Sequence, residues 1–314
     1  MFDDVPFYVQ EFLLYIKTIK NRSNATIREY HYDLRDAFRY LKKEKFHLDD
    51  DLEKIDVTDI DIDFIQEITL NDLYQYLGFL SMSRSDKPTT RARKIASLKS
   101  FFNYVCLKKK VLKVNPTIDL ETPKLGKRIP KYLTLDESIS LLHSIDGKYK
   151  DRDYAIITIF LNCGLRLSEL VNINMNSIKD NTLQVIGKGN KERQIYLNDA
   201  CTNAINKYIC VRSKNNIKDQ DALFLSERGT RIGRRTVEML VKKYLKLAGL
   251  DYKKFSPHKL RHTAATLMHK YGNVDIRTLQ QILGHESIAT TEIYTHIDDE
   301  QVKEALKNNP LNNI

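Results

Sequence analysis

The chain has 314 residues, of which 42% are hydrophobic, and a formal net charge of +10. It is longer than the roughly 100–200 residues of a typical single domain, so two domains are expected. No run approaches the roughly 18 consecutive apolar residues of a membrane span, and the acidic N-terminus excludes a signal peptide. We therefore expect a cytoplasmic protein without a membrane anchor, and the positive charge favours a polyanionic partner such as nucleic acid.

The first third of the chain is predicted to be helical. Ser23 is placed to cap a helix in which apolar residues recur at helical spacing. These residues are Ile27, Tyr30, Leu34, Phe38 and Leu41. Residues 69–80 and 91–105 show the same spacing. We expect the three helices to bury one face each in a helical domain at residues 1–115.

Charged residues in this part of the chain favour a nucleic-acid contact. Residues 91–105 carry cations beside their apolar stripe, namely Arg91, Arg93, Lys94 and Lys99. A run of charge usually marks a solvated helix face, but the net positive charge of the chain favours contacts with DNA phosphates. Residues 49–64, by contrast, are strongly acidic and cannot lie against DNA. They are predicted to form a solvent-facing insertion.

Residues 116–133 are predicted to be an extended linker. The stretch from 115 to 134 contains three prolines, each of which fixes φ and removes a backbone donor. Thr134 and Glu137 then have the spacing of a capping box, which marks the start of a helix. A second domain is therefore expected at residues 134–314.

The second domain is predicted to combine helices with a small antiparallel sheet. Residues 153–173 are an apolar helical region that Gly164 interrupts. Residues 182–197 contain β-branched runs around a glycine-rich turn, which is typical of a hairpin. Helical patterns follow toward the C-terminus. The expected fold class is therefore mainly α with a small antiparallel β-sheet.

Neither the cysteines nor the histidines predict a metal site. The four cysteines are scattered without CxxC spacing, which indicates reduced thiols. His258 and His262 have the four-residue spacing of metal ligands on a helix, but no third ligand accompanies them. Lys259 and Arg261 lie between them, and their charges disfavour a divalent ion. We expect no metal and no other cofactor.

Three side chains have two open interpretations each. Arg166, just after Gly164, needs an anion, which is either Glu169 or an external phosphate. Lys188, at the predicted hairpin tip, is either a solubilising charge or an ammonium that swings into a groove. Tyr294, considered alone, is far more often a core aromatic than a nucleophile.

Six residues together resemble the tyrosine recombinase, or phage integrase, family. They are Arg166, Lys188, His258, Arg261, His285 and Tyr294. Their order and contexts match in the stretches CGLRLSEL, GKGNKER, HKLRHTAAT and LGHESIATTEIYTH, and more weakly in RKIASLKSFFNYV. The resemblance spans the chain from about Tyr8 to Leu306 and is greatest to the compact Xer-type recombinases.

The resemblance implies a two-domain DNA clamp, with a helical SAM-like core-binding domain and a mixed α/β catalytic domain. It implies site-specific DNA recombination through a 3′-phosphotyrosyl intermediate and a Holliday junction, with neither metal nor ATP. The partners would be double-stranded DNA and further copies in a homo-tetramer on two DNA sites, with a second recombinase as an open alternative. Association with the nucleoid is also expected. The cellular role stays open between chromosome-dimer resolution, which would link the protein to chromosome segregation and cell division, mobile-element integration and DNA inversion.

The chemistry of phosphoryl transfer gives the arginines a role. Attack of Tyr294 on a phosphodiester adds negative charge to the non-bridging oxygens, and guanidinium groups bind such oxygens with fixed donor forks. Arg166 and Arg261 are therefore expected to form a phosphate clamp, with His285 as a third donor.

Tyrosine also needs proton transfer to react at neutral pH. With an ordinary pKa of about 10, roughly one tyrosine in a thousand is ionised. His258 is expected to take the proton of the tyrosine, and Lys188 to protonate the departing 5′ oxygen. Because the arginines stabilise the charge, the reaction requires no Mg²⁺.

Three other functions compete with recombination. A type IB topoisomerase uses much the same chemistry, but the paired domains and the apolar tail at residues 302–306 favour a recombinase. A non-catalytic DNA-binding relative would tolerate the loss of Tyr294. A zinc hydrolase built on His258 and His262 is the least favoured.

Overall fold

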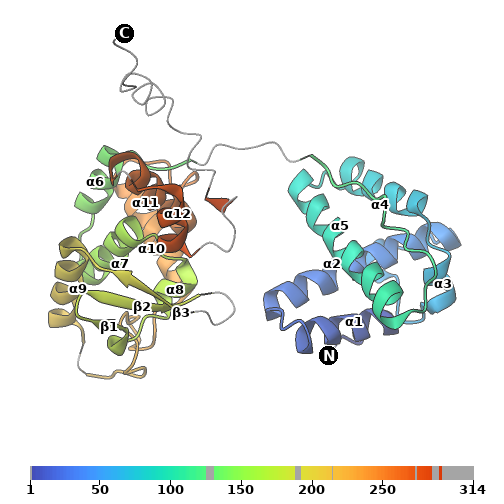
Figure 1. Cartoon of the computed structure of the whole chain (residues 1–314), viewed down its shortest axis with the longest axis horizontal. Coiled ribbons are helices and arrows are strands. Elements are labelled where there is room, and N and C mark those ends of the chain that lie inside the picture. The colour runs from blue at the N-terminus through green and yellow to red at the C-terminus, as the bar shows by residue number, and fades with distance from the viewer. Residues whose placement is uncertain are drawn as a thin grey trace, which may run out of the picture. The chain divides into compact units, whose positions relative to one another are not determined.

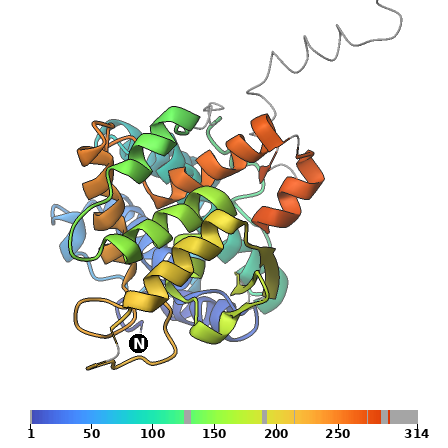
Figure 2. The same ribbon diagram turned by 90° about the vertical axis from the view of Figure 1, so that its left-hand side faces the viewer.

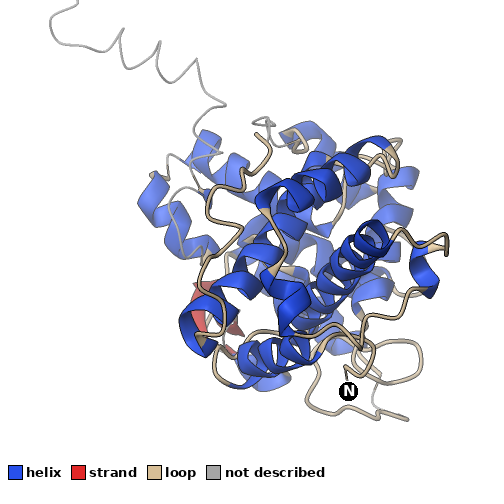
Figure 3. Ribbon diagram, turned by 90° about the vertical axis from the view of Figure 1, so that its right-hand side faces the viewer, coloured by secondary structure: helices blue, strands red, loops and turns tan. Residues whose placement is uncertain are grey.

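The computed structural model describes residues 2–124, 131–187, 192–213, 215–272, 274–284 and 290–291. The chain divides into two compact units, Met1–Lys127 and Arg128–Ile314. Helices dominate both units and a small sheet lies in the second (Figures 1 and 3). The fold class expected from the sequence, mainly α with a small antiparallel sheet, is therefore confirmed. Within the described ranges, no helix is both long and apolar enough to cross a membrane.

The first unit is a bundle of helices around one apolar core. Its main helices are α1 (Phe7–Thr18), α2 (Asn24–Phe46), α3 (Ile62–Gln66), α4 (Leu70–Met82) and α5 (Pro88–Asn103), with shorter turns at η1 (Leu52–Lys54) and η2 (Tyr104–Lys109). The Ser23 side chain accepts the backbone N–H of Thr26, so the predicted cap of α2 is confirmed. Phe12, Phe38 and Phe101, from α1, α2 and α5, are fully buried together.

The acidic segment at residues 49–64 does not face solvent throughout. Its apolar residues Ile55, Val57 and Ile60 are buried in the core of the first unit, whereas its carboxylates lie on the surface. Lys42 of α2 donates to the Asp59 carboxylate at 2.6 Å and so holds the segment against the helix. The prediction of a wholly solvent-facing insertion is therefore wrong, because apolar residues between the acidic ones contribute to the core.

The second unit contains the remaining helices and the sheet. The helices are α6 (Leu135–His143), α7 (Lys150–Cys163), α8 (Leu167–Val171), α9 (Asp199–Val211), α10 (Arg234–Leu247), α11 (Pro257–Gly272) and α12 (Ile276–Leu283), with the turn η3 (Met175–Ser177). Thr134 and Glu137 form the predicted capping box at the start of α6. In Figure 2, α7 lies between α9 and α11, and both helices contact it. Apolar residues therefore cover most sides of α7.

The sheet of the second unit has three antiparallel strands in the order β1-β2-β3. They are β1 (Ile178–Lys179), β2 (Thr182–Ile186) and β3 (Glu192–Tyr196). Leu183 lies opposite Ile195 and Val185 lies opposite Arg193. Because side chains alternate between the two faces of a strand, these four residues share one face. Leu183, Val185 and Ile195 are buried in the core, so this face is the inner one.

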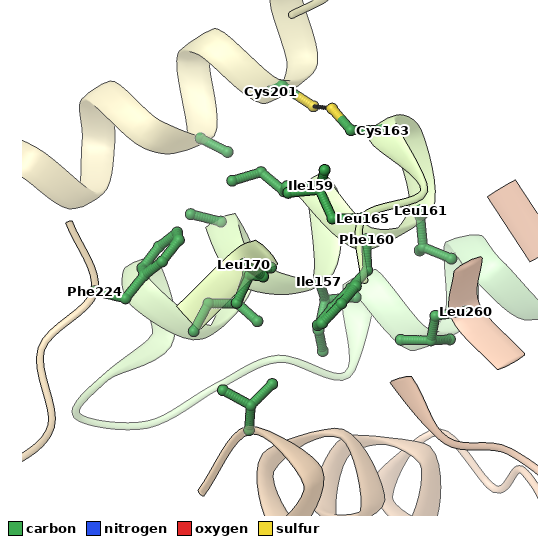
Figure 4. Close-up of a cluster of buried hydrophobic side chains, with 14 of the residues drawn as sticks. Ile157, Ile159, Phe160, Leu161, Cys163, Leu165, Leu170, Cys201, Phe224 and Leu260 are labelled. Atoms are coloured by element: carbon green, nitrogen blue, oxygen red, sulfur yellow. Dashed lines mark hydrogen bonds between the residues drawn. The ribbon is translucent and has the colours of Figure 1, made fainter. Parts of the chain in front are cut away.

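The core of the second unit surrounds α7 (Figure 4). Ile157 and Phe160 of α7 are fully buried there with Leu260 of α11. At the edge of this cluster the sulfur atoms of Cys163 and Cys201 lie 3.7 Å apart. All four cysteines of the chain are free thiols, as their spacing predicted.

Candidate active site

A glycine turn at the end of α7 creates the junction at which the candidate residues meet. Gly164 caps α7 with φ of +59°, a left-handed conformation that glycine adopts at little cost. A Cβ atom at this position would lie 2.9 Å from Cδ2 of Leu283, so the end of α12 packs directly against the turn. Gly284 caps α12 in the same way, with φ of +63°.

Arg166 follows this turn as the N-cap residue of α8. Its Nη1 donates to Oε1 of Glu169 at 2.8 Å, and its Nη2 donates to the carbonyl oxygen of Gly284 at 2.8 Å. The side chain is 33% exposed. The ion pair with Glu169 is therefore present, yet among the described residues it and the carbonyl bond use two of the five side-chain N–H groups, so an external anion is still accommodated.

Arg261 projects from α11 into the same junction and is only 2% exposed. Its Nη1 donates to the carbonyl oxygen of Gly164 at 2.8 Å, and its Nη2 donates to that of Leu283 at 2.6 Å. These oxygens belong to the C-terminal ends of α7 and α12, where helix carbonyls lack intrahelical partners and carry partial negative charge. Backbone carbonyl oxygens thus hold both arginines at this junction, and the Glu169 side chain adds a further contact to Arg166.

His258 lies one turn before Arg261 on α11. Partial loss of hydration, followed by the charges of Lys259, Arg261 and Arg166, lowers the pKa of His258 below its ordinary value. Its Nε2 lies 3.1 Å from Nε2 of His262, and a hydrogen bond between them requires one nitrogen to be an acceptor. His258 is therefore suited to remain neutral at pH 7 and to accept a proton.

The two histidines do not form a metal site with any of the other described residues. Across the ranges that the structure describes, no three histidine, cysteine, aspartate or glutamate side chains are placed to hold an ion. His258 and His262 face each other with ring centroids 4.5 Å apart, and Lys259 and Arg261 follow directly on the same helix turn. Their positive charge makes this position unfavourable for a divalent cation.

A buried carboxylate lies beneath the arginines. Glu169 has a side chain only 1% exposed and accepts hydrogen bonds from Arg166 and from Arg193 of β3, while Nη1 of Arg261 lies 3.8 Å from its Oε2. Burial alone would raise the pKa of Glu169, but the donors of Arg193 and Arg166 outweigh it and hold the pKa below its ordinary value. Among the described residues, the three guanidinium groups therefore outnumber the one carboxylate that they surround, which leaves an excess of positive charge.

Sequence patterns reveal these residues unequally. Glu169 was visible as an ion-pair candidate because it lies three residues after Arg166 on α8. Arg193 ends the stretch GKGNKER that resembles the family, but the pattern assigned it no role, since a cation in a hairpin strand is usually a solvated charge. Only its place on the inner face of β3, opposite Val185, directs it toward the site.

Three residues of the predicted set lie outside the described residues: Lys188, His285 and Tyr294. The strands that flank Lys188 do form the predicted hairpin, because β2 pairs antiparallel with β3. Of the predicted set, Arg166 and Arg261 are brought together at the ends of α7 and α12, and His258 lies close enough for both charges to lower its pKa.

The four cations expected to contact DNA occupy different environments in the first unit. Lys94 is 8% exposed, and its ammonium donates to Asp36 at 2.5 Å and to the hydroxyl of Tyr76 at 3.3 Å. This burial argues against the expected phosphate contact of Lys94, whose charge instead stabilises the packing of α5 on α2 and α4. A charge run in the sequence does not reveal which of its members has a buried partner.

The other three cations of α5 are closer to solvent. Nη1 of Arg93 donates to the Asp33 carboxylate at 2.5 Å, and its side chain is 39% exposed. Nη1 of Arg91 donates to the carbonyl oxygen of Asp86 at 2.7 Å. Lys99 is partly exposed. All three are thus more accessible to solvent than the buried Lys94.

Both units match models of phage integrase domains when the chain is compared with known protein families. Residues 131–301 match the model described as "Phage integrase family", and residues 9–109 match the one described as "Phage integrase, N-terminal SAM-like domain". The chain is 59% identical to the tyrosine recombinase XerC of Caldanaerobacter subterraneus subsp. tengcongensis over 308 residues, which cover 98% of this chain and 87% of that protein.

Two solved structures share the fold. The XerH site-specific recombinase bound to its difH substrate aligns with a TM-score of 0.68 and 22% identity, covering 96% of this chain and 84% of the other. The integrase of transposon Tn1549 in complex with transposon right-end DNA aligns with a TM-score of 0.72 and 21% identity, covering 96% and 98%.

Proposed function

The chain belongs to the phage integrase family and is a tyrosine site-specific recombinase, and we propose that Arg166, His258 and Arg261 form part of its catalytic site. The observation that carries this proposal is the convergence of the two guanidinium groups on the adjoining ends of α7 and α12. They are held there by carbonyl oxygens, so little reorganisation is needed when charge develops on a phosphate.

The clamp stabilises the pentacoordinate phosphorane that forms during strand cleavage. Its non-bridging oxygens gain negative charge, and Arg166 and Arg261 present charged donors to them. Arg261 is buried, so its field is weakly screened by water and acts more strongly on a nearby anion. By analogy with other oxyanion donors, each arginine contributes about 3–4 kcal/mol to the transition state.

The remaining steps are assigned to residues that the sequence pattern names. Tyr294 attacks the phosphorus and forms a 3′-phosphotyrosyl ester, while His258 accepts its proton. Lys188 protonates the departing 5′ oxygen, and His285 donates to a phosphate oxygen. Since the ester conserves the energy of the phosphodiester bond, a 5′ hydroxyl from a second duplex reseals the strand without ATP.

The partner is double-stranded DNA, in keeping with the DNA complexes of the XerH recombinase and the Tn1549 integrase. We assign DNA positioning to the helical domain at residues 1–115, with Arg91, Arg93 and Lys99 as phosphate contacts, and catalysis to residues 134–314, joined by the linker at 116–133. Exchange between two duplexes requires four strands to be cut, and each chain supplies one nucleophile. A tetramer on two DNA sites follows, either of this chain alone or with a second recombinase.

Covalent trapping on genomic DNA tests the function. When the purified protein is incubated with fragmented DNA of its own genome in EDTA, we expect protein attached to the 3′ end of a break at one recurrent sequence. Sequencing of the attached fragments identifies the site. A strict requirement for a divalent metal would contradict the arginine clamp, and adducts scattered over many sequences, with relaxation of any supercoiled plasmid, would indicate a topoisomerase instead.

The rate of cleavage is expected to fall only at acidic pH. His258 acts in its neutral form, and its pKa lies below its ordinary value of 6.5, so the second-order rate constant should decline at acidic pH with a midpoint below 6.5. This constant reports ionisation in the free enzyme and is measured on a nicked substrate at low DNA concentration. The His258→Gln variant should lack the decline, and a midpoint above 6.5 would contradict the role of the lowered pKa.

A further inference from the structure

We propose that Arg193 of β3 is a positioning residue for the catalytic arginines, because it occupies the buried Glu169 carboxylate and thereby keeps Arg166 and Arg261 directed at the phosphate. The proposal rests on the clamp assigned above. Arg193 touches no reacting atom in it and acts through Glu169 and the Gly284 turn.

The contact between Arg193 and Glu169 is bidentate. Nη1 of Arg193 donates to Oε1 at 2.6 Å and Nη2 donates to Oε2 at 2.9 Å. Two parallel charge-assisted bonds of this kind fix orientation as well as distance. The side chain of Arg193 is 15% exposed and that of Glu169 is 1% exposed, so water competes little for the pair.

These bonds complete the acceptor capacity of the carboxylate. Oε1 accepts Nη1 of Arg166 in addition to Arg193, and Oε2 accepts the backbone N–H of Arg166 in addition to Arg193. A carboxylate offers about four acceptor sites, so the two arginines fill them all. Arg261 lies just outside this set, with Nη1 at 3.8 Å from Oε2.

Loss of Arg193 would therefore redirect the clamp. Half of the acceptor sites on a buried carboxylate would be open, which is costly. The nearest further guanidinium is that of Arg261, which needs to move by only about 1 Å to form a hydrogen bond to Glu169. Such a bond would pull Arg261 from its helix-end carbonyls, and both arginines would then share one anion instead of addressing the phosphate.

Arg193 also supports the second anchor of Arg166. A Cβ atom at Gly284 would lie 3.0 Å from Cδ of Arg193 and 3.1 Å from its Nη1, so the arginine packs directly on the glycine turn. The carbonyl oxygen of Gly284 is the group that accepts Nη2 of Arg166. Both anchors of Arg166 are thus in contact with Arg193.

The alternation of β3 explains how a charged residue reaches this place. Arg193 and Ile195 share the inner face of the strand, whereas Glu192 and Gln194 face outward. An arginine on an inner face is costly unless an anion meets it, and Glu169 is that anion. Glu192, one residue earlier, accepts instead from Gln184 on the outer face at 2.6 Å, which makes it a matched control.

A double-mutant cycle on the native chain tests the proposal. The variants compared are Arg193→Gln, Glu169→Gln, the double variant, Arg193→Lys and Glu192→Gln. For each we measure the rate of covalent attachment at saturating nicked DNA, the dissociation constant for DNA at several salt concentrations, and Tm. We expect Arg193→Gln to slow attachment about 10–100-fold, by analogy with the loss of a hydrogen-bonding partner that orients a metal ligand. Its dissociation constant should change less than about twofold, with an unchanged salt dependence.

The cycle separates action through Glu169 from the other possibilities. If Arg193 acts through the carboxylate, the double variant should be no slower than Glu169→Gln, and Arg193→Lys should recover part of the rate. Additive losses would overturn the proposal, as would a normal rate in folded Arg193→Gln. Weaker binding with a reduced salt dependence and a normal rate at saturation would show a direct phosphate contact, which also overturns it.

The wild-type chain and Glu192→Gln provide the references. Glu192→Gln should attach to DNA at the wild-type rate. If the wild-type chain forms no covalent adduct, the proposed function fails together with this inference. If the wild-type chain attaches and Arg193→Gln attaches equally fast, this inference alone fails.

Discussion

Replacement of Tyr294 by phenylalanine is expected to abolish covalent attachment to DNA and to leave specific binding intact. The substitution removes the one oxygen that attacks the phosphodiester and keeps the aromatic ring. Loss of a nucleophile lowers catalytic rates by about 10⁴-fold or more in enzymes that use one. Attachment to a nicked suicide substrate, from which the cut fragment diffuses away, measures the first effect on a denaturing gel. A mobility-shift titration measures the second.

A second tyrosine of the same unit serves as a matched control for this experiment. Tyr271 lies on α11 and is 60% exposed, so Tyr271→Phe removes the same oxygen from a position far from any assigned role. Its attachment rate should equal that of the wild type. Covalent adducts formed by Tyr294→Phe, mapped by mass spectrometry to another residue, would refute the assignment of the nucleophile.

Replacement of Arg166 by alanine is expected to slow attachment by about 10²–10³-fold, the effect of losing a donor worth about 3–4 kcal/mol in the transition state. Arg166→Lys should lose less, but it should not reach the wild-type rate. A lysine keeps the charge, yet its single ammonium lacks the planar fork that joins Glu169 to the Gly284 carbonyl while facing a phosphate. Single-turnover attachment at saturating DNA measures the chemical step separately from binding.

Folding and charge are controlled separately in this experiment. Arg166 is one-third exposed and its pairing with Glu169 is partly replaced by Arg193, so Tm should fall only slightly. Arg228→Ala removes an exposed arginine of the same unit and should leave the chemical step unchanged at saturating DNA. An Arg166→Ala variant that attaches at the wild-type rate would exclude this arginine from the clamp.

Local structure was largely predictable from the sequence. The cap at Ser23, the capping box of Thr134 and Glu137, and the helix break at Gly164 all occur where the pattern placed them. Each of these signals depends on atoms only a few residues apart. The stabilisation of each helix end therefore depends on a short stretch of sequence, and that stretch is enough to predict it.

Burial of charged residues was not predictable in the same way. Lys94 and Arg93 are neighbours in one basic run, yet Lys94 is buried against Asp36 while Arg93 is more than one-third exposed. The acidic segment at residues 49–64 likewise hides Ile55 and Val57 in the core. The sequence shows which residues of such a segment are charged. It does not show which of them are buried, because the partner of each charge lies on another helix.

The helical character, the hairpin, several helix ends and the family of this chain could all be predicted from its residues. The partners that meet at the candidate site became visible only in the folded chain. Arg166 binds the carbonyl of Gly284, 118 positions away, and Arg261 binds that of Gly164, 97 positions away. Arg193 likewise donates a hydrogen bond to Glu169, which lies 24 positions earlier in the chain. Caps and turns arise from neighbouring residues, whereas these contacts exist only after the burial of apolar side chains around α7 has brought distant helix ends together.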